Sequence, residues 1–325
     1  MLRRLFYAVV ALTGVAVAGA VAGYLWLQQR FDAPGPLAAP KSVVIERGAG
    51  VAFIAQVLAD AGVVDEPLVF TIGVRLFSRG QTLKAGEYEF APGMSQRQAM
   101  QLLIDGGTLM HRLTMAEGLT SAEVLALVAA AEALTGDMPA VPPEGSLLPE
   151  TYFFSRGETR AELVRRMTAN MADTLAELWA GRDPNLPLRT PEEAVVLASI
   201  VEKETGVAAE RPRVAAVFIN RLNLGMALQS DPTIIYALTL GKAPLGRELT
   251  RADLQNKSPY NTYVTPGLPP GPIANPGRAA LEAVLHPATT KDLFFVADGT
   301  GGHAFAETLD EHNKNVAAWR KLRNP

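Results

Sequence analysis

The 325-residue chain contains no cysteine and comparatively few charged residues. Without a thiol it cannot form a disulfide scaffold, hold an iron–sulfur cluster or a cysteine zinc site, or use a cysteine nucleophile. Charged residues make up 19% of the chain, against roughly 25% in an ordinary soluble domain, and 48% of the residues are hydrophobic. This composition excludes disorder as the dominant state and is sufficient for one or two packed cores.

The sequence also lacks basic clusters and several common functional motifs. Three of its 30 basic residues and none of its 33 acidic residues lie within positions 1–30, so the remainder carries a formal charge of −6. An acidic body without lysine or arginine clusters argues against a nucleic-acid partner. The four histidines show no His-x-x-x-His spacing, so no metal site is expected. A glycine-rich phosphate loop and a nucleophile elbow are missing too, which argues against phosphoryl and acyl transfer.

The first prominent feature is an uncharged segment of 23 residues, from Leu5 to Leu27. As a helix it would extend about 35 Å, enough to cross the hydrocarbon core of a membrane. Arg3 and Arg4 precede it, which predicts a single-pass protein of the inner (cytoplasmic) membrane with residues 1–4 in the cytoplasm and the body outside. Tyr24 and Trp26 occupy the expected position of the outer aromatic belt.

A cleaved signal peptide is the alternative, because Ala16-Val17-Ala18 fits a small-residue cleavage site. The apolar sequence continues for nine residues past Ala18, longer than a signal peptide requires, and this favours an uncleaved anchor. Residues 28–41 are predicted to form a linker. Its Asp32–Lys41 portion contains three prolines, which favour an extended spacer.

Residues 42–110 are predicted to form a small α+β domain. Apolar periodicity indicates a strand at Ser42–Glu46, helices at Val51–Ala61 and Glu66–Phe77, a strand at Ala85–Phe90 and a further helix at Ser95–Asp105. Ser95 is the expected N-cap of this last helix. The order strand–helix–helix–strand resembles a LysM domain, a module that binds glycan chains rich in N-acetylglucosamine. A small packing domain without a ligand is the alternative.

Residues 111–325 are expected to form a mainly helical domain, so the predicted fold class is α+β. Helices are predicted at Ser121–Leu134, Glu158–Leu178, Pro191–Thr205 and Arg211–Asn223. Between Lys257 and Pro287 the chain becomes rich in proline and glycine. A long irregular segment inside a compact domain is more often a binding surface than a spacer, so we expect this one to form a wall of a groove.

The helix predicted over Pro191–Thr205 places an acidic residue among apolar ones. Thr190 is its expected N-cap. At about 100° per residue, and with Leu197 as the reference, Val201 lies at about 40° and Glu204 at about −20°. Glu204 therefore falls within the apolar stripe, whereas Glu202 falls at its edge.

Two interpretations of Glu204 follow from this position. In the first, Glu204 ends a fraying helix or pairs with Arg211 or Arg213. Alternatively, apolar surroundings disfavour its ionised form and raise its pKa, so that the carboxyl stays protonated near neutral pH. A carboxylic acid in that state can protonate a glycosidic oxygen.

Four blocks occur in order between Pro191 and Asn313: ASIVEKETG, VFINRLNLGMALQSDPTIIYAL, SPYNTYVTPGLPPGPIANPG and HPATTKDLFFVADGTGGHAF. Together they resemble the endolytic murein transglycosylase (MltG, YceG-like) family, and the resemblance extends over essentially the whole exported body. It implies a membrane-anchored enzyme that cleaves peptidoglycan glycan strands internally. The catalytic acid of the family is the second glutamate of the EKE triplet, which is Glu204 here, the residue that the periodicity also singles out.

A hydrolytic glycosidase normally needs two carboxyl groups. The resemblance implies instead that Glu204 alone acts, first protonating the oxygen of the β-1,4 bond between N-acetylmuramic acid and N-acetylglucosamine. As a carboxylate it then accepts the proton of the C6 hydroxyl of N-acetylmuramic acid, which closes a 1,6-anhydro ring. No cofactor is implied, and the implied partners are peptidoglycan glycan strands and peptidoglycan synthases. Two alternatives remain open: a non-catalytic peptidoglycan-binding scaffold of the wall-synthesis machinery, and a lysozyme-like hydrolase that uses Glu204 and Asp231.

Polar and aromatic residues of these blocks are expected to bind the saccharide, because sugars bind by stacking on aromatic faces and by hydrogen bonds to short polar side chains. Asp231 also suits a turn or a helix N-cap, and the tyrosines also suit a core turn. Asn275 either faces the substrate or caps a helix that begins at Arg278. The predicted substrate-binding residues are Gln229, Asp231, Tyr260, Asn261, Thr262, Tyr263 and Asn275.

Overall fold

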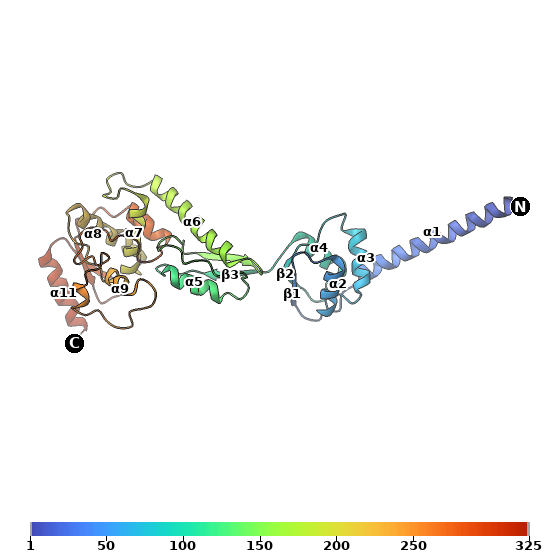
Figure 1. Ribbon diagram of the computed structural model, residues 1–325, viewed down its shortest axis with the longest axis horizontal. Coiled ribbons are helices and arrows are strands. Elements are labelled where there is room, and N and C mark those ends of the chain that lie inside the picture. The colour runs from blue at the N-terminus through green and yellow to red at the C-terminus, as the bar shows by residue number, and fades with distance from the viewer. Residues whose placement is uncertain (1, 324–325) are drawn as a thin grey trace. The chain divides into compact units, whose positions relative to one another are not determined.

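The computed structural model describes residues 2–323, which divide into two compact units (Figure 1). The first unit runs to His111 and includes Ser155–Gly157. The second contains Arg112–Phe154 and the chain from Glu158 onward. Short two-stranded sheets accompany the helices, so the fold is mixed α+β and mostly helical. This fold class agrees with the prediction.

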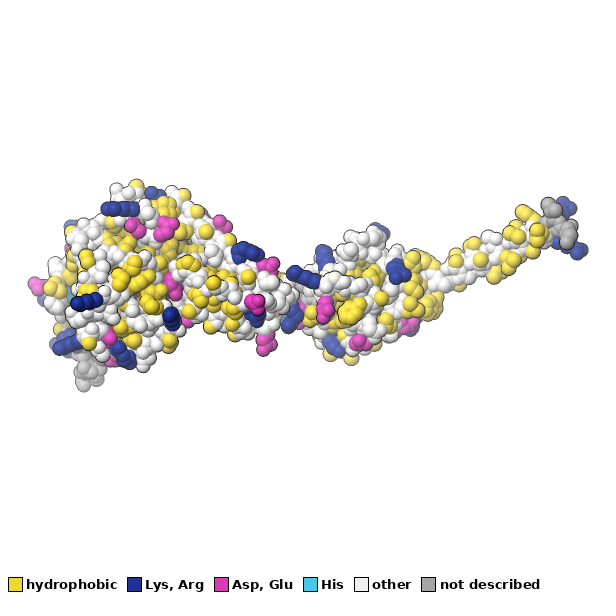
Figure 2. All heavy atoms as spheres, in the orientation of Figure 1, with side chains coloured by type: hydrophobic (Ala, Val, Ile, Leu, Met, Phe, Trp, Pro, Cys, Tyr) yellow, Lys and Arg dark blue, Asp and Glu magenta, His cyan; other side chains and the backbone are white. Residues whose placement is uncertain are grey.

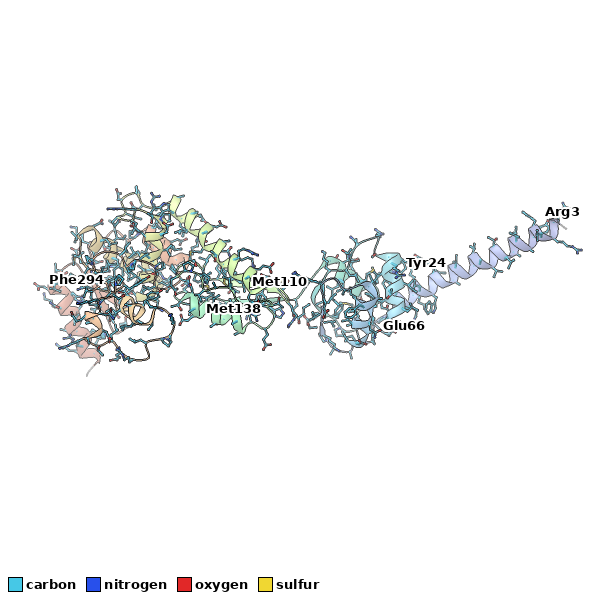
Figure 3. The ribbon with its side chains drawn as sticks, in the orientation of Figure 1. Arg3, Tyr24, Glu66, Met110, Met138 and Phe294 are labelled. Carbon is cyan, nitrogen blue, oxygen red and sulfur yellow. The ribbon has the colours of Figure 1, made fainter. Side chains whose placement is uncertain are left out.

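The first unit begins with the apolar helix α1 (Leu2–Asp32). Its most apolar window has a mean hydropathy of 2.2 and is not buried, so the helix is long and apolar enough to cross a membrane, a property that it shares with signal sequences. Figure 2 shows apolar side chains along the helix and basic ones at its end, where Figure 3 places Arg3. Residues 28–32 are helical rather than extended, because Leu27 and Phe31 are buried in the core of the unit.

The body of the first unit contains β1 (Lys41–Ile45), α2 (Val51–Asp60), α3 (Pro67–Phe77), β2 (Gly86–Phe90) and α4 (Gln96–Asp105). The order strand–helix–helix–strand is the predicted one. The two strands pair antiparallel, with Val43 opposite Tyr88. Ser95 caps α4 as expected, in a capping box with Gln98. Aromatic and aliphatic side chains from α1, both strands and all three helices fill one core.

The second unit contains most of the helices. Its elements in chain order are β3 (Met110–Thr114, which begins at the boundary between the units), α5 (Ser121–Ala130), β4 (Thr151–Ser155), α6 (Arg160–Ala180), α7 (Pro191–Glu204), α8 (Arg211–Asn223), α9 (Asp231–Thr239), α10 (Arg278–Leu285), β5 (Phe294–Ala297), β6 (His303–Ala306) and α11 (Leu309–Arg323). Short 3₁₀ turns lie at Ala208–Glu210 and Asp253–Gln255. The pairs β3–β4 and β5–β6 each form a two-stranded sheet.

Helix α7 lies in the core of the second unit. Helices α6, α8 and α10 pack against it, and every residue from Ala194 to Val201 is buried. The expectation of a single apolar stripe was therefore too narrow, because neighbouring helices cover several faces of α7 at once. Ser199 is accommodated in this interior since its hydroxyl donates to the carbonyl of Val196 and accepts from the N–H of Ile273.

Residues 257–277 contain no helix or strand, as the proline-rich composition predicts for this described part of the chain. Its end leads into α10, whose N-cap is Gly277 rather than Asn275. The irregular segment 257–277 lies between α9 and α10 in the chain.

Helix α5 ends at Ala130, earlier than predicted, while α6 begins after a capping box formed by Thr159 and Glu162.

Candidate active site

Helix α7 carries Glu204 to its last turn. Thr190 accepts a hydrogen bond from the N–H of Glu193 and begins the helix, and Pro191 occupies its first position. The helix ends at Glu204, one residue earlier than predicted. Because the preceding turns are enclosed by the core, the position of the Glu204 backbone is fixed by packing rather than by the flexible end of a surface helix.

The Glu204 carboxyl group is partly buried and accepts a hydrogen bond from the Ser230 hydroxyl, with 2.5 Å between the oxygens. Burial raises the pKa of Glu204 to about 7. The hydrogen bond from Ser230 lowers it, the nearby negative charge of Asp231 raises it, and the positive charges of His303 and Arg221 lower it. Burial prevails, so the carboxyl group holds a proton close to neutral pH.

Ser230 lies in a tight loop directly before α9. Gln229 has a backbone φ of 53°, in the left-handed region that a side chain makes unfavourable. Two hydrogen bonds to Thr262 hold this loop: the N–H of Gln229 donates to its carbonyl at 3.1 Å, and the N–H of Ser230 donates to its hydroxyl at 3.0 Å. The strain at Gln229 is therefore balanced by contacts that place Ser230 against Glu204.

Asp231 is the first residue of α9 and has an exposed side chain. The Tyr263 hydroxyl donates to its carboxylate at 2.7 Å. Burial and this bond raise the pKa of Tyr263, which keeps its hydroxyl protonated and able to donate. The structure thus brings Glu204, Asp231 and Tyr263 together, although they lie on three separate segments of the chain.

Arg221, which the sequence analysis did not single out, is buried behind this group. Its guanidinium donates to the carbonyls of Leu293, Ala227 and Leu228 at 2.7, 3.3 and 2.8 Å. It thereby fixes the loop that leads to Ser230. The sequence shows only an arginine near the end of a predicted helix. The partners of Arg221 are backbone carbonyls, which no sequence pattern identifies.

His303 also lies near Glu204 but is engaged elsewhere. Its Nδ1 lies 2.8 Å from the Glu210 carboxylate, and its ring contacts Phe295 edge-on with 5.3 Å between ring centroids. The positive form of His303 would lower the pKa of Glu204. Glu210 therefore holds the imidazole at a position from which its charge affects Glu204.

Three of the other predicted substrate-binding residues, Asn261, Thr262 and Asn275, are buried, and Tyr260 is half-buried. Asn261 donates to the carbonyls of Leu254 and Asn256 and accepts from the N–H of Tyr263. Asn275 accepts from the N–H of Leu147 and donates to the carbonyl of Leu119 and the hydroxyl of Ser121. The side chains of Asn261, Thr262 and Asn275 are buried and have internal partners, and Tyr260 packs on Tyr236 with 4.9 Å between ring centroids.

The two remaining residues of the EKE triplet point elsewhere. Glu202 has a buried carboxylate that accepts from the N–H of Gly277 at 2.9 Å and lies 3.5 Å from Arg211. Lys203 donates to the carbonyl of Gly118. Arg211 also pairs with Glu117, and Arg213 pairs with Asp292, so the two arginines considered as partners of Glu204 are paired with other carboxylates.

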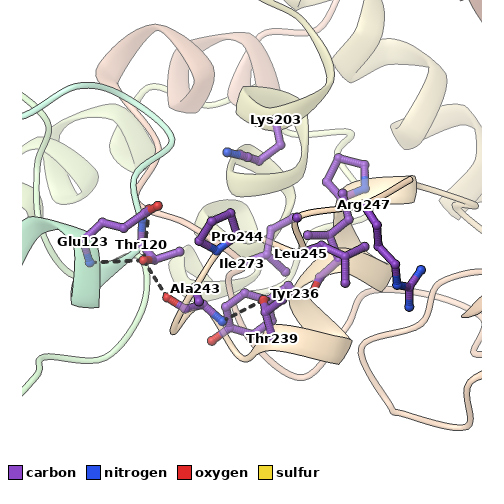
Figure 4. Close-up of a pocket in the computed structure, with 14 residues that line it drawn as sticks. Thr120, Glu123, Lys203, Tyr236, Thr239, Ala243, Pro244, Leu245, Arg247 and Ile273 are labelled. Carbon is purple, nitrogen blue, oxygen red and sulfur yellow. Dashed lines mark hydrogen bonds between the residues drawn. The ribbon is translucent and has the colours of Figure 1, made fainter. Parts of the chain in front are cut away.

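The second unit contains a cavity of about 440 Å³ (Figure 4), which none of Glu204, Ser230, Asp231 and Tyr263 lines. Lys203 and Pro232, the neighbours of Glu204 and Asp231 in the chain, both line it, together with Tyr236. Its remaining lining residues are Thr120, Glu123, Ile235, Thr239, Gly241, Ala243, Pro244, Leu245, Gly246, Arg247 and Ile273. Apolar walls with a tyrosine and a few polar groups are typical of a small-molecule or saccharide pocket.

The chain belongs to the YceG-like family, whose model matches residues 43–318. This confirms the family that the four sequence blocks indicate. A protein of Bacillus subtilis (strain 168) named endolytic murein transglycosylase is 31% identical over 314 residues, which cover 87% of this chain and 86% of that protein.

A protein of the same name from Streptococcus pneumoniae serotype 2 (strain D39) is 30% identical over 348 residues. The match covers 91% of this chain but 62% of the pneumococcal protein. A crystal structure of a yceG-like protein from Listeria monocytogenes is similar with a TM-score of 0.50 and 31% identity, covering 85% of this chain and 98% of that one. Homologues over most of the chain therefore carry the name of a murein transglycosylase.

Proposed function

We propose that this chain is an endolytic lytic transglycosylase that cleaves the β-1,4 bond between N-acetylmuramic acid and N-acetylglucosamine within peptidoglycan strands. The observation that carries the proposal is the Glu204 carboxyl group, whose burial raises its pKa to about 7 in a chain of the YceG-like family. A carboxyl group with this pKa can both give and take a proton near neutral pH.

In the proposed reaction, protonated Glu204 gives its proton to the glycosidic oxygen as the bond from that oxygen to C1 of N-acetylmuramic acid breaks. The departing N-acetylglucosamine leaves with a hydroxyl group. The Glu204 carboxylate next accepts the proton of the C6 hydroxyl, and the oxygen of that hydroxyl bonds to C1. The product has a 1,6-anhydro end, Glu204 is protonated again, and no water is consumed.

Asp231 and Tyr263 have supporting parts in this proposal. The Asp231 carboxylate is negative, exposed and oriented by the Tyr263 hydroxyl, so it can stabilise positive charge that develops at C1. Gln229 is exposed on the loop beside it. Asn261, Thr262 and Asn275, predicted to bind substrate, have internal partners, and we assign them to holding the walls of the site.

We further propose that residues 5–27 anchor the chain in the inner membrane, with residues 1–4 cytoplasmic and the linker 28–41, the LysM-like domain 42–110 and the catalytic domain 111–325 outside. The apolar character of α1 supports the anchor. The βααβ order of β1, α2, α3 and β2 supports the LysM-like assignment, with peptidoglycan glycan as its ligand. Peptidoglycan synthases are the proposed protein partners, because the enzyme acts on the strands that they make.

The test is digestion of purified peptidoglycan by the full chain in detergent, with the products identified by mass. Fragments with anhydro ends, lighter by one water than hydrolysed ones, support the proposal. Glu204→Gln is expected to reduce cleavage by at least about 10²-fold, and Glu202→Gln, its neighbour in the same triplet, is the matched control that retains cleavage.

Asp231 gives a second candidate function, because its carboxylate is near enough to Glu204 to affect its pKa. In a lysozyme-like hydrolase both carboxyl groups would be required and the products would have reducing ends. Asp231→Asn distinguishes the two: a transglycosylase loses the charge stabilisation at C1 and cleaves more slowly but still to anhydro-ended products, whereas a hydrolase loses cleavage. A chain that cleaves nothing under any condition would favour the scaffold alternative.

A further inference from the structure

The outer face of α3 carries a row of exposed apolar side chains. Leu68, Ile72 and Leu76 are one turn apart and are 71%, 38% and 56% exposed. Exposed Arg75 lies beside them, and the helix contains no acidic residue. A single exposed leucine is ordinary, but a continuous apolar row on one helix indicates a contact surface.

The inner face of α3 packs against the end of α1. The Phe31 ring lies directly on the α3 backbone at Gly73, where any side chain would collide with it. The rings of Phe31 and Phe77 are 5.4 Å apart, and Glu66, the N-cap residue of α3, forms an ion pair with Arg30 of α1. Both ends of α3 are therefore fixed to the last turns of α1.

These contacts determine the depth of α3 relative to a membrane that α1 crosses. The uncharged stretch of α1 ends at Leu27, so Tyr24 and Trp26 are at the level of the headgroups. The Tyr24 ring is 6.0 Å from the ring of Phe77, the last residue of α3. Figure 3 shows Tyr24 beside α3, and Figure 1 shows α3 at the end of the unit where α1 emerges.

We propose that α3 is an interfacial helix whose Leu68–Ile72–Leu76 face inserts into the boundary between headgroups and acyl chains of the bilayer that α1 crosses. The proposal rests on the proposed membrane anchor. The exposed apolar face has Arg75 beside it and no acidic residue within the helix, which suits the surface of an anionic membrane. A lipid surface is the occupant that the structure favours, because α3 ends beside Tyr24 of α1, and the neighbouring Leu25 and Trp26 are 57% and 54% exposed.

This arrangement would change how the first unit is held. A chain that leaves the membrane through a flexible tether can rotate freely, whereas a unit attached through α1 and α3 has two contacts and one orientation. The unit is then held flat on the membrane, with the same face always toward the lipid.

The absence of cysteine allows single labels to be placed. The full chain is reconstituted in vesicles of phosphatidylethanolamine and phosphatidylglycerol, with a fluorophore on Ile72→Cys. Quenching by nitroxide lipids is compared with quenching by aqueous iodide. Exposed Glu89, on β2, provides the water-facing control as Glu89→Cys, and Ala16→Cys reports on the anchor itself.

The Ile72 label is expected to show a ratio of lipid to aqueous quenching severalfold above that of the Glu89 label. Adding Leu76→Glu should lower this ratio severalfold without changing the thermal midpoint, since Leu76 is exposed. Iodide quenching at Ile72 equal to that at Glu89 would overturn the proposal, and so would protection from both quenchers, which would indicate a protein on this face. If Ala16 is not quenched by lipid, the anchor fails and this proposal fails with it, while cleavage by Glu204 is unaffected.

Discussion

The hydroxyl of Ser230 donates a hydrogen bond of 2.5 Å to Oε1 of Glu204. Ser230 is the N-cap residue of α9, and its N–H donates to buried Thr262. One residue thus connects the end of α7, the start of α9 and the proline-rich segment. This bond lowers the pKa of Glu204, but burial raises the pKa by more. The carboxyl group is therefore oriented and still able to hold a proton near neutral pH.

The first prediction concerns pH. The pKa of Glu204 is raised to about 7 by burial, and the proposed first step needs its protonated form. Activity as kcat/KM is therefore expected to be constant on the acidic side and to fall about tenfold per pH unit above the pKa. The measurement is release of anhydro-ended fragments between pH 5 and 9. A rate that rises continuously through this range would contradict the role of Glu204 as the acid.

The second prediction concerns Ser230→Ala. The substitution removes a hydrogen bond that lowers the pKa of Glu204, so the descending limb of the pH profile should move to higher pH. The rate on the acidic side should also fall, by about tenfold, because the carboxyl group loses the contact that orients it. Thr262→Ser, which keeps the hydroxyl that accepts from Ser230, is the control and should leave the limb in place. An unchanged limb in Ser230→Ala would mean that this bond does not act on Glu204.

The third prediction concerns the stability of Glu204→Gln. A carboxyl group whose pKa is raised on folding stabilises the folded state below its unfolded value of 4.5, and this contribution is lost as the pH rises to about 7. Glutamine does not titrate, so the stability of the variant relative to the wild type should increase between pH 5 and 7. The variant should keep this advantage above pH 7. The gain is at most about 3 kcal/mol. Thermal midpoints measured at pH 5 and 8 check this, and a gap that does not widen would indicate an ordinary pKa.

The fourth prediction separates Glu202 from Glu204. Glu202 accepts from the N–H of Gly277 at the start of α10, so Glu202→Ala should destabilise the second unit by about 1–3 kcal/mol. Glu202→Gln keeps an acceptor for this N–H and should be less destabilising. Both variants should retain the pH profile of the wild type, which Glu204→Gln cannot. If folded Glu202→Gln lost the pH profile, Glu202 rather than Glu204 would be the catalytic acid.

Local sequence patterns predicted much of this arrangement. The N-cap Ser95, the proline at the start of α7 and the lack of regular structure before Gly277 follow from side-chain chemistry within a few residues. Glu204 could be selected because one turn of helix places it among apolar residues. Periodicity gives the direction of a side chain, but it did not predict that the neighbouring helices would also bury the Glu202 carboxylate.

The partners of these residues could not be predicted in the same way. Ser230 stands between Gln229 and Asp231, yet its contact with Glu204 depends on a left-handed backbone at Gln229. Asn275 was expected at the substrate or at the cap of α10, but it joins Leu119, Ser121 and Leu147, which are distant in the sequence. Such contacts arise from tertiary packing, which composition and periodicity do not encode.

The most direct test of the central claim, that one carboxyl group cleaves the strand without water, is digestion of peptidoglycan in water enriched in the heavy oxygen isotope. If the C6 hydroxyl is the nucleophile, the new N-acetylmuramic acid ends are 1,6-anhydro and contain no heavy oxygen. Reducing ends that carry one heavy oxygen per cleavage would show that water attacks C1, and would contradict the account.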